Sequence, residues 1–170
     1  MTPTVTGEHT PGKNLMAESA QYTILVVDDE ELVRNLIVTL LSRSGHTSIA
    51  AVDGVDALDR MKGNKIDAVI TDIKMPNMDG VALTIEILKR NPGLPILVMT
   101  AFGEEYSAGA AIAAGAREYI KKPFTPDEFF AQLQKMIKDS ETIKRLRSEK
   151  GSDENVQDLV GELEETLKED

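Results

Sequence analysis

The sequence predicts an α/β fold in which five parallel strands form one sheet with helices on both faces. Short apolar runs alternate five times with stretches of helical apolar spacing, the pattern of repeated strand–helix units. Three of the runs are apolar throughout, as strands buried on both faces of a parallel sheet are. Charged residues directly follow several runs, at the ends where open sheets bind ligands, and we expect the strand order 2-1-3-4-5.

Five apolar runs are predicted to be strands, and a helical pattern follows each of them. The first helix has apolar residues at three- and four-residue steps from Leu32 to Leu41, and Gly45 ends it. Asp53 can cap the second helix, and the segment 91–93 closes the third. The predicted strands span 23–27, 47–52, 66–71, 95–99 and 117–120.

The last two helices carry the clearest boundary signals. The fourth is alanine-rich and runs from about Glu104 to Ala114, with Gly115 as a left-handed stop. The fifth begins at a capping box in which Thr125 and Glu128 bond each other's backbone amides, with a proline at the first helical position.

The two ends of the chain differ from its middle. The first residues carry prolines and glycines among threonines without periodicity, which indicates a flexible arm. Ile143 and Leu146 can prolong the last helix, and apolar residues at three- and four-residue steps over 155–168 predict an amphipathic helix. We therefore divide the chain into an arm (1–20), a domain (21–140) and an acidic, helical extension (141–170).

Composition narrows the class of protein. The formal charge of -10 argues against general nucleic-acid binding, which needs a basic face. There is no cysteine, so thiolate metal sites are excluded, and the two histidines, His9 and His46, form no ligand cluster. No apolar stretch approaches the roughly 20 residues of a membrane span, and the N-terminus lacks a signal pattern, so we expect a cytoplasmic protein.

Carboxylates gather at the predicted strand ends. Asp28 and Asp29 follow the first strand, Asp72 follows the third, and Lys122 follows the fifth. Carboxylates that share one edge repel each other unless a cation lies among them. Magnesium suits such oxygen ligands, with manganese as an alternative, and a carboxylate beside it is a competent nucleophile toward phosphorus. Lys122 and the hydroxyl of Thr100 suit phosphoryl oxygens.

Each of these residues also has a purely structural interpretation. An aspartate after a strand commonly serves a turn or a cap, Thr100 can cap a helix, and the segment around Lys122 can be a simple loop. The combination at the ends of successive strands favours a shared site.

Four separated motifs resemble the signature of response-regulator receiver domains, of the chemotaxis-receiver type. The resemblance covers roughly residues 22–140 and implies a flavodoxin-like receiver fold. The motifs agree in order and spacing, and they occupy residues 24–30, 71–80, 99–101 and 122–124.

The resemblance implies a role for each motif residue. Asp72 is the expected phosphoacceptor, which takes its phosphoryl group from a histidine kinase or a phosphotransfer protein. Magnesium is expected to be held by Asp28, Asp29, Asp72 and the backbone carbonyl of Lys74. The phosphoryl oxygens are expected to contact Thr100, the amide of Ala101 and Lys122.

The resemblance also implies a switch. Phosphorylation draws Thr100 inward and Tyr119 fills the space, which changes the surface of the fourth helix, fifth strand and fifth helix. Pro123 is a candidate for a cis peptide bond. We further hypothesise that the bulky Phe102 slows loss of the phosphoryl group.

We expect a stand-alone, phosphorylation-dependent switch that acts on an unknown output protein, with no enzymatic turnover beyond its own phosphorylation and dephosphorylation. A homodimer is left open. One alternative is a receiver from a longer transcriptional or enzymatic regulator. A second is an aspartate-nucleophile phosphohydrolase, against which Lys74 argues, because such enzymes carry an acid–base aspartate at that position. A third is a degenerate receiver that serves as a scaffold.

Overall fold

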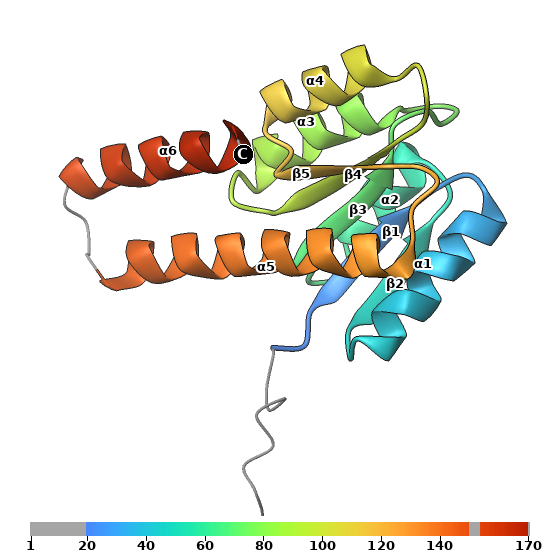
Figure 1. Ribbon diagram of the computed structural model, residues 1–170, viewed down its shortest axis with the longest axis horizontal. Helices are drawn as coiled ribbons and strands as arrows, with labels where there is room; N and C mark the ends of the chain where they lie inside the picture. The colour runs from blue at the N-terminus through green and yellow to red at the C-terminus, as the bar shows by residue number, and fades with distance from the viewer. Residues whose placement is uncertain (1–19, 150–153, 170) are drawn as a thin grey trace, which may run out of the picture.

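Five short parallel strands form the sheet, in the order β2-β1-β3-β4-β5 that the sequence predicts (Figure 1). The computed structural model describes residues 20–149 and 154–169. All four neighbouring pairs are parallel, so the C-terminal ends of the strands lie at one edge. The strands are β1 (Thr23–Val27), β2 (Thr47–Ala51), β3 (Ala68–Asp72), β4 (Ile96–Thr100) and β5 (Glu118–Lys121).

Helices cover both faces of the sheet, as Figure 1 shows. Helices α2, α3 and α4 pack on one face, and α1 and α5 pack on the other. None of the described helices has an apolar stretch that would suffice to cross a membrane. The helices are α1 (Glu31–Arg43), α2 (Gly54–Met61), α3 (Gly80–Arg90), α4 (Glu105–Ala114), α5 (Pro126–Glu149) and α6 (Glu154–Glu169).

The central strands are buried along their whole length, and this burial extends to the charged residue at the end of β3. Every residue of β3 and β4 is buried, which confirms the prediction from their continuous apolar runs. Strand β3 begins at Ala68, two residues later than predicted, and includes Asp72. The Asp67 carboxylate instead accepts a hydrogen bond from the Thr23 amide at 2.9 Å. Asp72 is therefore a buried strand residue at the C-terminal end of β3.

The predicted helix boundaries are confirmed by their hydrogen bonds. The Asp53 carboxylate accepts from the Asp56 amide at 2.8 Å, and Gly115 ends α4 with a left-handed φ of 117°. The Thr125 amide donates to Glu128 at 2.9 Å, and the Glu128 amide donates to the Thr125 hydroxyl at 3.1 Å. These caps fix where each helix leaves the edge that carries the aspartates.

The C-terminal extension continues α5 and then folds back. Helix α5 runs unbroken across the boundary placed after residue 140, because Ser140 and Ile143 are both buried. Helix α6 occupies nearly the segment predicted to be amphipathic and lies alongside α5 (Figure 1). Its Val160 is buried, and Glu164 accepts from Arg147 of α5 at 2.7 Å. The N-terminal arm up to residue 19 and the expected break at 151–153 lie outside the described residues.

Candidate metal and phosphoryl site

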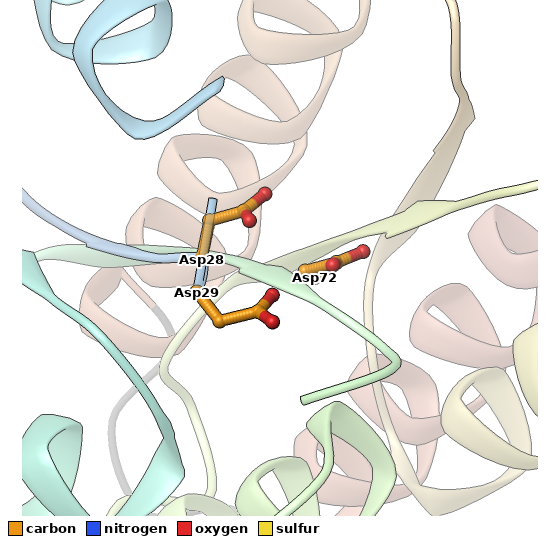
Figure 2. A group of neighbouring side chains, drawn as sticks. All are labelled: Asp28, Asp29 and Asp72. Carbon is orange, nitrogen blue, oxygen red and sulfur yellow. The ribbon is translucent and has the colours of Figure 1, made fainter. Parts of the chain in front are cut away.

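Three aspartates meet at the C-terminal edge of the central strands. Val27 lies opposite Thr71 in the pairing of β1 with β3, so Asp28 and Asp72 follow side by side. Each of Asp28, Asp29 and Asp72 offers a carboxylate oxygen, and these oxygens lie within 4.8 Å of one another (Figure 2). Asp28 and Asp72 are buried, whereas Asp29 is exposed. The three aspartates therefore form the cluster that the sequence predicts, and Asp29 lies on its solvent-exposed side.

A lysine from β5's end completes the cluster. The Lys122 ammonium lies 3.0 Å from Asp72 Oδ1 and 3.8 Å from Asp28 Oδ2. Its backbone amide donates to the Thr100 carbonyl at 2.6 Å, and its peptide bond to Pro123 is cis. The lysine is thus fixed through its backbone to the end of β4, and its side chain reaches across to β3.

The electrostatics of the cluster reflect burial that Lys122 only partly offsets. Burial raises the pKa of Asp72 to about 6, although the hydrogen bond from Lys122 opposes this shift. Burial also raises the pKa of Asp28, against the hydrogen bond from the Glu30 amide. Burial acts to lower the pKa of Lys122, but its hydrogen bond to Asp72 and the nearby carboxylates outweigh that effect and raise it. One ammonium is too little positive charge for three carboxylates.

The donor set fits a divalent cation. Asp28 Oδ1 accepts from the Glu30 amide at 2.8 Å, but Asp28 Oδ2 is buried without a hydrogen-bond partner. A buried carboxylate oxygen without a partner is costly, and a hard cation such as Mg²⁺ would satisfy it. Lys74 lies two residues beyond Asp72 in the loop that leaves β3, with an exposed side chain.

A close backbone approach holds the loop that follows Asp72. The Gly80 amide donates to the Ile73 carbonyl at 2.7 Å, and a Cβ added at Gly80 would collide with the Asp72 carbonyl. Asn77 adopts a φ of 67° and donates to Asp53 at 2.8 Å. The glycine of this motif therefore serves backbone geometry and fixes the position of Asp72.

The other predicted phosphoryl-binding groups have hydrogen-bond partners other than Asp72. Thr100 is buried, and its hydroxyl lies 3.5 Å from the Ile120 carbonyl, at the limit of a hydrogen bond. The Ala101 amide donates to the Glu104 carboxylate at 2.8 Å. An anionic side chain therefore already occupies the amide expected to bind a phosphoryl oxygen.

Two residues that support the site carry no sequence signal of their own. Arg34 Nη1 donates to the Asp28 carbonyl at 2.8 Å and fixes the backbone of the cluster. Glu104 caps the Ala101 amide from three residues away. Arg34 looks like an ordinary polar position of an amphipathic helix, and Glu104 like an ordinary first-turn acid. Only the folded loop reveals their partners.

Tyr119, which is predicted to act in the switch, lies on a neighbouring surface that has exposed aromatic side chains and a cavity. Tyr119 is 44% exposed, Tyr106 90% and Phe102 100%. A cavity of about 1050 Å³ lies among α4, β5 and α5, and it reaches Thr100 and Lys122 at one end. Leu167 of α6 lines the same cavity. We call this surface the α4–β5–α5 face.

Comparisons with known proteins agree on one family. The family model that matches, over residues 24–134, is the response regulator receiver domain. The "Alkaline phosphatase synthesis transcriptional regulatory protein PhoP" of Bacillus subtilis (strain 168) is 34% identical over 140 residues, which cover 82% of this chain and 58% of that protein. "Response regulator MprA" of Mycobacterium sp. (strain KMS) is 38% identical over 115 residues, which cover 68% of this chain and 50% of that one. The chain thus spans between half and three fifths of the length of these relatives.

Solved structures give the same result. A response regulator receiver domain protein from Clostridium thermocellum superposes with a TM-score of 0.68 at 31% identity, over 72% of this chain and 98% of that chain. NtrX from Brucella abortus, solved in complex with ADP, superposes with a TM-score of 0.74 at 30% identity, over 82% of this chain and 33% of that one.

Proposed function

Because this chain belongs to the response regulator receiver domain family, we propose that it is a phosphorylation-dependent switch whose phosphoacceptor is Asp72. The observation that carries this proposal is the contact of Lys122 with Asp72 at 3.0 Å, beside the buried Asp28. A carboxylate that lies between an ammonium and two further carboxylates has both a partner for an incoming phosphoryl group and a place for a cation. A structural ion pair alone would not need the other two aspartates.

The proposed reaction is a direct transfer onto the Asp72 carboxylate. One of its oxygens forms a bond to phosphorus as the P–N bond of a phosphohistidine breaks. The electron pair of that bond stays on the imidazole, which takes a proton from solvent. Asp72 must be ionised to attack, and with a pKa of about 6 it is mostly ionised at neutral pH.

In the proposed reaction, Lys122 and a bound cation would both stabilise negative charge on the transferred phosphoryl group. Lys122 would move from the free carboxylate to a phosphoryl oxygen, because it is already within contact distance of the attacking group. Mg²⁺, held by Asp28, Asp29, Asp72 and the Lys74 carbonyl, would supply charge neutralisation for the transferred group. Asp28 Oδ2, which has no hydrogen-bond partner and lies 3.8 Å from Lys122, supports this assignment.

The contact between Glu104 and Ala101 suggests how the signal leaves the site. A phosphoryl oxygen on Asp72 would compete with the Glu104 carboxylate for the Ala101 amide, since that amide holds one acceptor now. Displacement of Glu104 would free the first turn of α4. Inward movement of Thr100 would then open space beneath β5 for Tyr119, which is half exposed. The α4–β5–α5 face would change through both steps.

The proposed partners are a histidine kinase or phosphotransfer protein as donor and an output protein that reads the α4–β5–α5 face. The cytoplasmic location expected from the sequence is part of this proposal. A second candidate is the receiver part of a longer regulator, and the length of the relatives favours it. In that case α5 and α6 would lead toward an output domain, and control of transcription, which PhoP's description names, would belong to the whole protein.

Intact-mass measurement after treatment with acetyl phosphate and Mg²⁺ tests the proposed function. We expect the wild-type chain to gain one phosphoryl mass and the Asp72→Asn variant to gain none. Omission of Mg²⁺ should suppress the gain in the wild type. An equal gain in both proteins would place the acceptor elsewhere, and no gain in either would favour a scaffold without phosphotransfer.

A further inference from the structure

A second charged cavity lies at the N-terminal edge of the sheet, opposite the aspartates. It has a volume of about 500 Å³, and its walls come from the segments that precede β3, β4 and β5 together with the second half of α5. Its lining has four cations and a single acid, Asp67, in a chain whose formal charge is -10. The cations are Lys65, Arg117, Lys144 and Arg147.

Arg117 is the unusual member of this group. It precedes β5, and its backbone amide donates to the Ile96 carbonyl at 2.8 Å. Arg117 is only 7% exposed, yet among the side chains that the structure describes, those of residues 20–149 and 160–168, it has no ion-pair partner and its guanidinium forms no hydrogen bond. Its Nη1 is buried without any partner. A buried guanidinium is costly unless it is paired, so this arrangement calls for a counter-charge.

Among the described side chains no acid forms an ion pair with Arg117, although Asp139, next to the cavity residue Ser140, also has a buried oxygen without a hydrogen-bond partner. Asp67 accepts from the Thr23 amide at 2.9 Å. Glu118, the next residue in β5, lies 3.1 Å from the ammonium of Lys135. Glu164 of α6 binds Arg147 at the rim of the cavity, at 2.7 Å.

The rest of the lining suits a small anion. Ile66, Leu94 and Ile143 are buried and form an apolar wall, which lowers the local dielectric and strengthens any ion contact made there. Lys65 and Lys144 are exposed at the rim, where they would draw an anion from solvent. The guanidinium offers several N–H donors in one plane, which matches the oxygens of a phosphate.

We propose that this cavity binds an oxyanion of the phosphate class, free or carried on a small molecule, with Arg117 as its buried donor. Arg117 also lines the cavity of the α4–β5–α5 face, so an anion bound to Arg117 would contact a residue that the two cavities share. The site is independent of Asp72, which lies at the other end of the strands.

Titration of the full chain with inorganic phosphate, followed by amide and arginine side-chain NMR signals, tests this assignment. The titration is run without Mg²⁺, at constant ionic strength set with chloride, on the wild type and on Asp72→Asn. We expect saturable shifts at the amides of Asn91, Gly93 and Leu94 and at the Arg117 side chain in both proteins. Because the site does not involve Asp72, these shifts should persist even if phosphotransfer to Asp72 fails.

Matched variants separate the cavity from general salt effects. Arg117→Met should weaken phosphate binding by at least about tenfold, since a charge-assisted donor is lost. Arg43→Met removes the same charge at an exposed position on α1 and should leave the binding constant unchanged. If Arg117→Met does not fold, Lys144→Met at the rim takes its place and should weaken binding to a smaller extent.

Two results would overturn the assignment. One is a titration without saturable shifts at the amides of Asn91, Gly93 and Leu94 or at the Arg117 side chain, which would mean that water alone solvates Arg117. The other is an equal binding constant in Arg117→Met and Arg43→Met, which would place the anion elsewhere.

Discussion

The aspartate edge and the α4–β5–α5 face adjoin each other but are built on different principles. At the edge, buried strand ends fix Asp28 and Asp72, and Lys122 spans from β5 to β3. On the face, Phe102 and Tyr106 are almost fully exposed, and Tyr119 is half exposed. The difference teaches that the proposed chemistry would rest on buried backbone, whereas the proposed readout would rest on exposed side chains. Changes at the edge should therefore have large effects, and changes on the face should have small ones.

Lys122→Met should produce the largest effect. Loss of the ammonium beside Asp72 removes the group that would stabilise charge on the transferred phosphoryl, so we expect the rate of phosphorylation by acetyl phosphate to fall about 10²-fold or more. Lys121→Met is the matched control, because Lys121 is exposed and its side chain belongs to the opposite side of β5. Time-resolved intact-mass measurement compares the two rates. Similar rates in both variants would remove Lys122 from the chemistry.

Substitution of one glycine in each region should change the free energy of unfolding in opposite directions. Gly80→Ala drives a Cβ into the Asp72 carbonyl and should lower the free energy of unfolding by about 3 kcal/mol. Gly109→Ala, in α4 on the face, adds a methyl group to open space within a helix and should raise stability by about 0.5–1 kcal/mol. Urea unfolding measures both. Changes of the same sign would contradict the close approach at Gly80.

The pH dependence of the free energy of unfolding should show that, without a bound metal, the ionised Asp72 carboxylate is unfavourable in the folded protein. The pKa of Asp72 is raised to about 6 in the folded chain, above its value of 3.8 in the unfolded chain, so ionisation of Asp72 disfavours the fold. Its favourable contribution is complete below pH 3.8 and is lost as the pH rises through 6. Asp72→Asn should therefore stabilise the metal-free protein by about 2 kcal/mol or less at pH 7.5, and this gain should disappear toward pH 4.

Asp59→Asn is the control for that experiment, because Asp59 is largely exposed and its ion pair with Lys62 is long, at 3.8 Å. Its effect on stability should be small across the same range. Mg²⁺ should narrow the gap at pH 7.5, since it stabilises the wild type by binding the folded cluster. A gain from Asp72→Asn that grows toward low pH would contradict the direction of the Asp72 shift.

The contact of α6 with α5 should contribute little free energy. Arg147→Glu breaks an exposed ion pair and should cost less than about 1 kcal/mol, while amide exchange in α6 becomes faster. The double variant Arg147→Glu with Glu164→Arg restores opposite charges and should return exchange toward the wild-type rate. Equal exchange in all three proteins would mean that α6 docks through Val160 and its apolar neighbours alone.

Phe102→Ala should have the smallest effect on the chemistry. Phe102 is fully exposed beside Thr100 and Ala101, so it can obstruct water only at the surface. We expect the lifetime of the phosphoryl group to shorten by less than about tenfold, which corresponds to about 1.4 kcal/mol in the barrier. The decay of the phosphorylated mass measures this lifetime, and an unchanged lifetime would remove the hypothesis.

The features that could be predicted from the sequence are those that a parallel sheet determines, namely the strands and the residues at their common edge. Apolar runs located the sheet, and residues that follow such runs must share an edge, so the meeting of Asp28, Asp29, Asp72 and Lys122 followed from topology. Rotamers and loops lay beyond that reasoning. Neither the bond of Glu104 to the Ala101 amide nor the burial of Arg117 follows from a periodic pattern. The docking of α6 was likewise left open, because an amphipathic helix does not identify its own partner surface.

The most direct test of the central claim locates the phosphoryl group at the level of the residue. The phosphorylated chain is reduced with borohydride, which converts an acyl phosphate to an alcohol, and its peptides are sequenced by mass spectrometry. We predict homoserine at position 72 alone, and none when Mg²⁺ is withheld. Reduction at Asp28 or Asp29 instead, or an unmodified Asp72 in a chain that has gained a phosphoryl mass, would contradict the account.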